Sequence, residues 1–244
     1  MIPARRKNLP SPGATAAHAG LILSSYLQSA DDKGEGKRQL LDQAIKAAGA
    51  AGPLYKLAFE RWKTVTSGAE TASADLSVLG RLIVGLGGEN VLETGITLHH
   101  TYGMPIIPGS ALKGLAAHYC HREWGIQSPD LLEGGSHHRT IFGATDDSGH
   151  VVFHDSWIYP ADKTLFPDVM TPHHGSYYSG KEGAGPTDFD DPNPVTFLSV
   201  TGTFRVAVSC ENKEWADFTL KLLKAALKDW GVGGKTSSGY GRMG

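Results

Sequence analysis

Residues 103–114, GMPIIPGSALKG, constrain the local fold of this chain more than any other stretch. Pro105 and Pro108 each fix their own φ angle and push the preceding residue into an extended conformation. Ser110, after the flexible Gly109, is a good helix N-cap because its hydroxyl can accept a hydrogen bond from the first turn. The sequence therefore predicts a rigid extended segment that leads directly into a helix beginning at Ser110.

Residues 111–124 show the apolar spacing of that helix, and Gly125 stands where a helix-ending glycine is expected. The unpaired N–H groups and partial positive charge of a helix start favour a bound anion. Lys113 lies in the first turn, where the helix dipole disfavours a cation unless a phosphate is nearby. One interpretation is a phosphate site formed by Gly109, Ser110 and Lys113. The alternative is an ordinary helix start with a solvated lysine.

The glycine-rich segment 231–244 is the second landmark. Its residues Gly234-Lys235-Thr236 resemble the end of a phosphate-binding P-loop, but Asp229 replaces that motif's first glycine and too few residues follow for its helix. We predict instead a mobile loop that approaches a ligand closely and forms one site with residues 103–114. The residues expected to contact the ligand are Lys235, Ser237, Ser238, Tyr240 and Arg242. A frayed chain end is the alternative.

Composition limits the possible classes of protein. A chain of 244 residues, 40% of them hydrophobic and 20% charged, is ordinary for one or two globular domains. With a formal net charge of −2, a nucleic-acid site must be a local patch. The two cysteines, Cys120 and Cys210, form no C-x-x-C motif, which is typical of a reducing cytoplasm. No apolar run reaches the roughly 18 residues of a membrane span. Residues 1–14 are expected to be a flexible arm.

Residues 15–75 are predicted to form an N-terminal helical region. Helical spacing of apolar residues occurs at 15–28, 37–48 and 52–64. Residues 67–74 are small and polar, and we expect them to be a link. No residue of this region carries recognisable chemistry.

Residues 76–244 alternate between strand and helix patterns. The predicted strands are 76–85, 151–158, 194–200 and 203–210, the last two joined as a hairpin. Asn212 is expected to cap a final helix. This order of elements is typical of a split βαβ arrangement, so we predict an α+β, ferredoxin-like (RRM-related) core.

Two further segments of this core bear on function. Residues 91–102 are expected to be extended and to bring His99 and His100 to the start of the predicted helix. Residues 160–193 mix proline, glycine, tyrosine and histidine, too irregularly for a core element. We predict that they form a long loop insertion that orders against RNA or a partner.

Together these motifs resemble the RAMP superfamily of CRISPR-associated RNA-binding proteins. The resemblance rests on residues 103–114, on the closing Gly239-Tyr240-Gly241, and on Phe142-Gly143 with 149–155 between them. Residues 170–178 and 191–198, with Ala19-Gly20-Leu21 near the start, are similar to the sixth-subunit family of the type III-B (Cmr) effector complex. Ala111 departs from the pattern, because many members have a second serine there.

The resemblance implies an RRM-related ferredoxin-like fold that binds CRISPR guide RNA along its backbone. It implies a place near the guide 3′ end of a ribonucleoprotein that targets foreign RNA in antiviral defence. The target RNA and the other RAMP subunits of the Cmr complex are then the partners. Subunits of this family are regarded as non-catalytic, and we expect no cofactor. The expected RNA contacts are Gly109, Ser110, Lys113, His99, His100 and the C-terminal loop residues named above.

Other interpretations stay open. The histidine pairs 99–100, 137–138 and 173–174 suggest a metal site, but a polar loop or RNA-binding edge accounts for them more simply. Asp146, Asp147 and Asp155 could bind a metal for phosphodiester cleavage. The alternative is that Asp146 and Asp147 form a turn and that Asp155, in a predicted strand, is only a hydrogen-bond acceptor. An RNA-processing endoribonuclease that uses a histidine as general acid–base, and an assembly subunit that contacts only protein, are the alternative functions.

Overall fold

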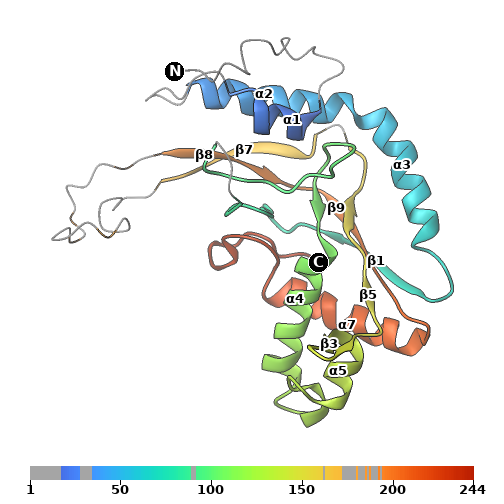
Figure 1. Cartoon of the computed structure of the whole chain (residues 1–244). Helices are drawn as coiled ribbons and strands as arrows, with labels where there is room; N and C mark the ends of the chain where they lie inside the picture. The colour runs from blue at the N-terminus through green and yellow to red at the C-terminus, as the bar shows by residue number, and fades with distance from the viewer. Residues whose placement is uncertain are drawn as a thin grey trace.

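The computed structural model describes residues 18–27, 35–88, 92–161, 163–171 and 194–244, together with the single residues 180, 185, 187 and 192. Within these residues a main antiparallel sheet and a two-stranded ribbon are covered by helices on two sides (Figure 1). None of the described helices combines the length and apolar character that a membrane span requires. The expected arm 1–14 lies outside the described residues.

The main sheet is organised around β9 (Thr203–Ser209). On one side β9 pairs with β1 (Thr71–Ser77), and on the other with β5 (Val152–Phe153) and β6 (Ser156–Ile158). β2 (Ile106–Ile107) extends the sheet beyond β6. The predicted strand 151–158 is thus broken into β5 and β6, and all of these pairings are antiparallel.

The C-terminal residues lie along the free edge of β1. Met243 forms an isolated antiparallel bridge with Val78, and Ser77 and Gly244 exchange two backbone hydrogen bonds. The order across the sheet is therefore the C-terminal segment, β1, β9, β6 and β2.

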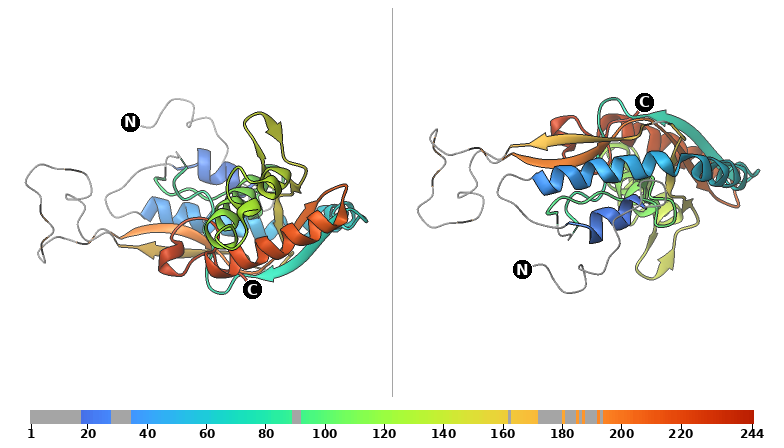
Figure 2. Two further views of the ribbon diagram at one scale, coloured as in Figure 1. Left: turned by 90° about the horizontal axis from the view of Figure 1, so that it is seen from below. Right: turned by 90° about the horizontal axis from the view of Figure 1, so that it is seen from above.

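α4 (Gly109–Tyr119) and α7 (Lys213–Asp229) cover one face of this sheet and pack on each other (Figure 2, view from below). α7 begins where predicted, because the Asn212 side chain accepts a hydrogen bond from the Glu214 N–H at 2.8 Å. The buried side of α7 is lined by Ala216, Leu222, Leu223, Ala226 and Leu227. This apolar stripe holds the helix on the sheet.

α3 (Gly52–Val65) covers the opposite face, and aromatic rings fill the space beneath it. Tyr55 and Phe59 of α3 are fully buried, and the rings of Trp62 and Trp157 stack with centroids 5.2 Å apart. The Tyr55 hydroxyl donates to the Ile158 carbonyl oxygen at 2.6 Å. Burial raises the pKa of this hydroxyl far above its ordinary value. The protein itself therefore closes this face of the sheet.

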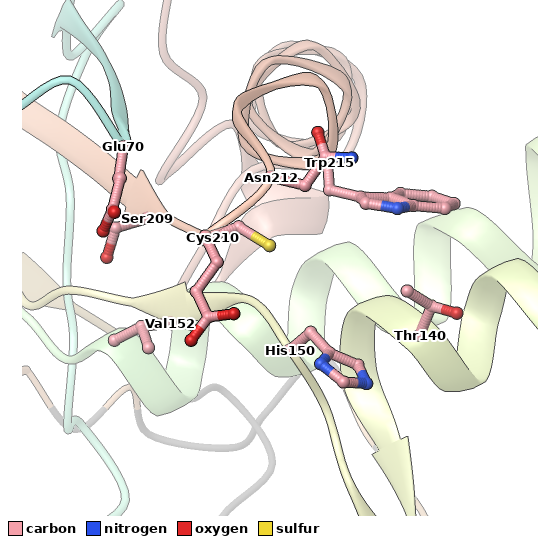
Figure 3. A pocket seen from close by; sticks show the side chains of 9 residues that line it. Glu70, Thr140, His150, Val152, Ser209, Cys210, Asn212 and Trp215 are labelled. Atoms are coloured by element: carbon pink, nitrogen blue, oxygen red, sulfur yellow. The ribbon is translucent and has the colours of Figure 1, made fainter.

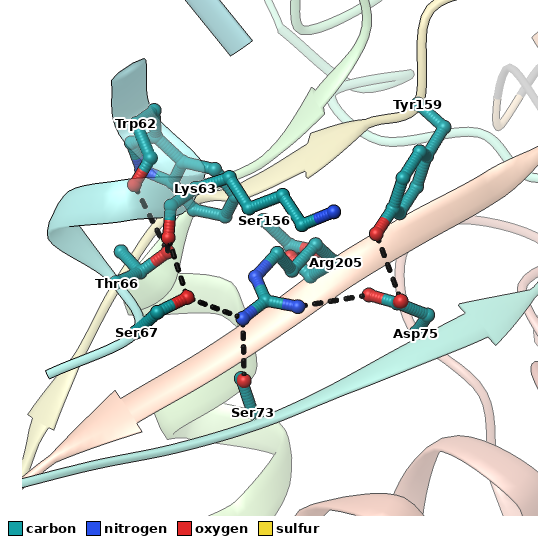
Figure 4. Close-up of polar contacts among 9 residues, drawn as sticks. All are labelled: Trp62, Lys63, Thr66, Ser67, Ser73, Asp75, Ser156, Tyr159 and Arg205. Carbon is teal, nitrogen blue, oxygen red and sulfur yellow. Dashed lines mark hydrogen bonds and ion pairs between the residues drawn. The ribbon is translucent and has the colours of Figure 1, made fainter. Parts of the chain in front are cut away.

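A polar cluster on the same face ties the end of α3 to the central strands (Figure 4). Arg205 of β9 is 9% exposed and pairs with Asp75 of β1 at 3.3 Å. It also donates to the Ser67 and Ser73 hydroxyls at 2.9 and 2.8 Å. The Tyr159 hydroxyl donates to the other Asp75 carboxylate oxygen at 2.8 Å. Both terminal nitrogens of Arg205 are thus paired or hydrogen-bonded, as a buried cation requires, whereas its Nε has no partner among the described residues.

The ribbon consists of β7 (Leu165–Met170) and β8 (Val195–Val200). α2 (Glu35–Ala50) packs on it, and α1 (Ala19–Ser25) packs on α2 (Figure 2, view from above). The predicted hairpin of 194–200 with 203–210 is wrong, because β8 pairs with β7 and β9 with β1. The turn at Thr201-Gly202 instead leads the chain from the ribbon into the main sheet. β7 is also regular structure inside the predicted loop 160–193, much of which lies outside the described residues.

The predicted helices 37–48 and 52–64 are confirmed as α2 and α3, and 15–28 in part as α1. The expected link 67–74 is wrong from Thr71 onward, where β1 begins. Small residues suit β1 because Ser73 and Asp75 bind Arg205 while Ala72 packs into the core. β1 ends at Ser77, so the strand predicted at 76–85 is also misplaced.

The helix predicted at 111–124 consists of two parts: α4 ends at Tyr119, and the chain continues as a π-helical turn, η2 (Cys120–Trp124). Gly125 has a φ of −61°, so it is not the expected left-handed glycine. A Cβ there would lie 2.6 Å from the His121 carbonyl oxygen, which explains the glycine. The remaining elements are η3 (Pro129–Leu131), α5 (Ser136–Phe142), β3 (Gly143–Ala144), β4 (Asp147–Ser148) and η4 (Thr236–Ser238).

Candidate functional site

The 103–114 stretch and the C-terminal loop meet at the end of α7, where a hollow of about 520 Å³ opens between them. α4 contributes Ala111 and Leu115, and the end of α7 contributes Asp229 and Trp230. The loop supplies the rest of the wall: Gly231, Val232, Gly233, Thr236, Ser237 and Arg242. The two landmarks of the sequence are therefore neighbours in space.

The start of α4 already holds a carboxylate. Asp155, in the break between β5 and β6, accepts a hydrogen bond from the Gly109 N–H at 2.8 Å. The N-cap residue is Pro108, so the prediction that Ser110 caps the helix is wrong by two residues. Glycine is required at position 109 because a Cβ would lie 2.1 Å from the Phe153 carbonyl oxygen. A phosphate at this helix start would meet the negative charge of Asp155, which argues against the predicted anion site.

Lys113 lies on the other flank of α4. Successive helical residues are about 100° apart, so Lys113 is about 200° around the helix from Ala111 and Leu115, which line the hollow. Ser110 is exposed on the outer side of the helix. The structure therefore brings the 103–114 stretch to the loop without placing Ser110 or Lys113 in the hollow.

Backbone hydrogen bonds hold the C-terminal loop in place, which corrects the expectation of a mobile segment. The Gly234 N–H donates to the Ile83 carbonyl oxygen at 2.8 Å, and the Gly241 N–H donates to the Arg81 carbonyl oxygen at 2.7 Å. Gly233 and Gly241 have φ angles of 90° and 77°, and a Cβ at either would lie 2.0 Å from a carbonyl oxygen. These glycines permit close packing of the loop inside the protein.

Polar groups of the loop are left for a ligand at Thr236, Ser237 and Arg242. The N–H groups of Thr236 and Ser237 precede the first intrahelical bond of η4, and within the described residues they have no backbone acceptor. Arg242 is exposed and makes no ion pair in the described part of the chain. Trp230 forms an aromatic wall, braced edge-on by Tyr119 with ring centroids 5.1 Å apart. A guanidinium, hydroxyls, N–H groups and an indole suit a phosphate and a nucleobase.

Lys235, Ser238 and Tyr240 belong to the same loop but do not line the hollow. The Tyr240 hydroxyl donates to an Asp168 carboxylate oxygen of β7 at 2.7 Å. Burial, together with this hydrogen bond, raises the pKa of the Tyr240 hydroxyl. Lys235 has a left-handed φ of 59°, and its carbonyl accepts hydrogen bonds from the Ser238 and Tyr240 N–H groups. Tyr240 thus fastens the loop to the ribbon.

His99 and His100 do not line the hollow, but His99 lies near the start of α4, as expected, within electrostatic range of Asp155. The His99 ring packs edge-on against Trp157 with centroids 4.6 Å apart, and its Nδ1 accepts a hydrogen bond from the Thr101 N–H at 3.1 Å. Burial lowers the pKa of His99, although the carboxylate of Asp155 acts in the opposite direction. His100 is exposed and borders a separate hollow beside α1.

Sequence analysis missed Thr236 and Trp230. Thr236 is followed by two serines, and nothing in the sequence distinguishes these three hydroxyl residues. The folded loop shows that Thr236 and Ser237 line the hollow. Trp230 had a visible signal, because it ends the apolar stripe of α7 immediately before the first loop glycine. An aromatic residue next to a glycine-rich segment is a reasonable stacking candidate.

The histidines have structural neighbours. His118 packs on Trp230, His137 on Trp215, and His138 on Phe142. Among the described residues no group of three or more histidine, cysteine, aspartate and glutamate side chains is placed to hold a metal ion. The pair 173–174 lies outside the described residues.

Comparison with known proteins gives a consistent family. A family model described as the RAMP superfamily matches residues 75–243. The chain is 29% identical to the CRISPR system Cmr subunit Cmr6 of Pyrococcus furiosus, over 98% of this chain and 88% of that protein. It is 23% identical to Cmr6 of Saccharolobus solfataricus, over 84% of this chain and 69% of that protein. Its fold is similar to that of a chain in the cryo-EM structure of the type III-B Cmr-β complex bound to cognate target RNA, with a TM-score of 0.61. The two chains are 22% identical, and the match covers 89% of this chain and 77% of that one.

Proposed function

The chain belongs to the RAMP superfamily and is homologous to Cmr6, and from that premise we propose that it is a guide-RNA-binding subunit of a type III-B CRISPR ribonucleoprotein. In this proposal it has no catalytic role and caps the assembly at the guide 3′ end. The assembly targets foreign RNA in antiviral defence, and its other RAMP subunits are the protein partners. Homology along 98% of the chain supports the assignment to this subunit type.

The sheet order supports a ferredoxin-like core for this subunit. The bridge at Met243, β1, β9 and β6 stand in the order fourth, first, third and second along the chain, with antiparallel neighbours throughout. The crossover helices α4 and α7 lie on one face. This is the arrangement of a split βαβ fold in which the last strand is reduced to a bridge.

The hollow between α4 and the C-terminal loop is the observation that carries the RNA-binding proposal. Arg242, Thr236 and Ser237 offer phosphate ligands there, and Trp230 offers a ring for stacking. Lys235 and Ser238 extend this polar surface along the loop. Ser110 and Lys113 provide a second contact on the outer flank of α4, separate from the hollow.

The composition of the hollow favours binding over cleavage. No histidine or cysteine lines it, and its one carboxylate, Asp229, accepts a hydrogen bond from the Tyr119 hydroxyl at 2.6 Å. A general acid–base pair is therefore lacking among the described residues around this hollow.

Filter binding tests the proposal with the full chain, a guide RNA from the same CRISPR locus, and buffers with and without magnesium. We expect binding without cleavage, and a weaker affinity for a guide truncated at its 3′ end than for one truncated at its 5′ end. Arg242→Ala should weaken binding, whereas Arg61→Ala on the exposed side of α3 should not. Cleavage would favour the endoribonuclease alternative, and absence of binding would favour a subunit that contacts only protein.

A further inference from the structure

A second hollow, of about 710 Å³, opens at the other end of α7 (Figure 3). It lies where β9 ends and α7 begins, with α5 and the segment before β5 as its far side. Its walls include the side chains of Glu70, Glu211 and Trp215. α7 has 17 residues, so about 25 Å of helix separates this hollow from the one with Arg242.

Two carboxylates give this hollow its charge. The backbone hydrogen bond from the Cys210 N–H to the Glu70 carbonyl oxygen, 3.1 Å long, holds Glu70 beside the segment that carries Glu211. Neither glutamate forms an ion pair within the described residues, and no lysine or arginine is among the lining residues. The nearest basic residue in sequence, Lys213, is paired with Asp217. The hollow therefore presents unneutralised negative charge.

Trp215 adds an aromatic wall across the hollow from Glu70 (Figure 3). His137 and Phe218 brace its indole edge-on, with ring centroids 5.2 and 6.0 Å away. The indole is only partly buried, so it remains accessible from the hollow. An accessible tryptophan beside two carboxylates favours an organic cation, because the ring face attracts positive charge while the carboxylates pair with it.

The composition of this hollow argues against RNA phosphates and metal ions as its ligands. RNA phosphates would be repelled by Glu70 and Glu211. The carboxylates are not part of any group of three or more metal-ligating side chains among the described residues. Arginine fits best among organic cations, because its planar guanidinium both stacks on an aromatic ring and binds carboxylates with two N–H groups.

We propose that this hollow is a protein-docking pocket that receives the arginine side chain of another protein subunit. The partner is thus a protein surface with a protruding arginine, bound at the end of α7 remote from the RNA hollow. Arginine is also enriched at protein interfaces, where it acts as an anchor. This inference is independent of RNA binding, because it uses none of the residues assigned to RNA.

Fluorine NMR of the full chain labelled with 5-fluorotryptophan tests the pocket directly. The chain has five tryptophans, and the Trp215→Phe variant assigns the resonance of interest. N-acetyl-arginine amide should shift the Trp215 resonance saturably, and the uncharged analogue N-acetyl-citrulline amide should not. Glu211→Gln and Glu70→Gln should each weaken the affinity roughly fivefold. Glu214→Gln, which makes the same charge change outside the pocket, should leave the affinity nearly unchanged.

Reconstitution with the other subunits tests the partner. The double variant Glu70→Gln/Glu211→Gln should enter the assembly less well while binding guide RNA with unchanged affinity. An equal response to citrulline, or shifts of all tryptophan resonances together, would overturn the pocket. Normal assembly of the double variant would overturn the partner. Unchanged RNA binding in Arg242→Ala would count against the proposed function and leave this inference intact.

Discussion

Replacement of Asp155 separates the two accounts of the α4 start, a helix capped by the protein and a helix open to a phosphate. Asp155→Ala removes the acceptor of the Gly109 N–H, a hydrogen bond of 2.8 Å. Asp155→Asn keeps a side-chain oxygen at the same position but removes its negative charge. The two variants therefore distinguish the hydrogen bond from the electrostatic interaction with the helix.

The expected magnitudes follow from capping energetics. Loss of a capping side chain costs about 1 kcal/mol of stability, and asparagine caps as well as aspartate does. A carboxylate near a helix start adds about 0.3–1 kcal/mol through the helix dipole. Asp155 is solvent-exposed, so we take the lower end of that range. We expect Asp155→Ala to lower the unfolding free energy by about 1 kcal/mol and Asp155→Asn by about 0.3 kcal/mol.

Thermal unfolding at neutral pH provides the assay. For a chain of this length, 1 kcal/mol corresponds to a change in Tm of about 2–4 °C, so the alanine variant should melt measurably lower. The control is Asp147→Ala, an exposed aspartate of β4 whose side chain makes no hydrogen bond within the described residues. An alanine variant as stable as the parent would refute the capping role. A rise in RNA affinity in Asp155→Asn would show that phosphate reaches the helix start, and would refute the argument that Asp155 closes it.

Three further results are expected. Arg242→Ala and Lys113→Ala should each lower the salt dependence of RNA binding, by roughly 0.7 per phosphate lost. Their effects should add, because Arg242 of the C-terminal loop lines the hollow whereas Lys113 lies on the flank of α4 that faces away from it; a double variant no weaker than one single variant would indicate a shared site. Gly241→Ala should destabilise the fold far more than Gly239→Ala, as judged by Tm, because both have positive φ but only the former would place a Cβ 2.0 Å from a carbonyl oxygen. Burial lowers the pKa of His138, so the folded protein binds a proton at this residue less readily than the unfolded chain does. The unfolding free energy is therefore unaffected by His138 above about pH 6.5 and declines as the pH falls through the lowered pKa. The dependence of Tm on pH between about pH 7 and 5 should flatten in His138→Gln.

Local signals in the sequence predicted the elements that depend on neighbouring residues. The helices α2 and α3 follow from the spacing of their apolar residues, and the start of α7 follows from Asn212, whose side chain caps it. These predictions succeeded because the interactions that define each element lie within a few residues of one another.

The errors arose where a distant partner decides the structure. Ser110 is a good cap by composition, but the helix begins earlier, and Asp155, from the break between β5 and β6, accepts the hydrogen bond of the Gly109 N–H. The segment of β1 around Ser73 and Asp75 lacks β-branched residues, yet it is a strand because β9 offers a full register of pairing and Arg205 binds its polar side chains. A single sequence contains neither piece of information.

The C-terminal loop shows the same limit from the opposite direction. Its glycines correctly indicated close backbone approach, but the approach is to the segment 81–83 of the same chain. The side chains that remain for a ligand, above all Thr236 and Arg242, are determined by how the loop turns on that segment. Sequence could therefore predict the location of the candidate site but only part of its membership.

The closure of the main sheet explains why the candidate site lies at a loop and not on the sheet. RRM domains stack bases on aromatic rings exposed on the sheet, but here Trp157 is already stacked on Trp62, and Tyr55 and Phe59 are buried beneath α3. Removal of a buried aromatic ring from a core typically costs about 3–5 kcal/mol, whereas stacking of one base returns about 1–3 kcal/mol. Lifting α3 would expose at least these two buried rings and also break the Arg205 cluster (Figure 4). Base stacking is too weak to open this face, and α4 and α7 cover the other. In the proposed function, RNA therefore contacts the edges of the fold, where Arg242 and Trp230 lie.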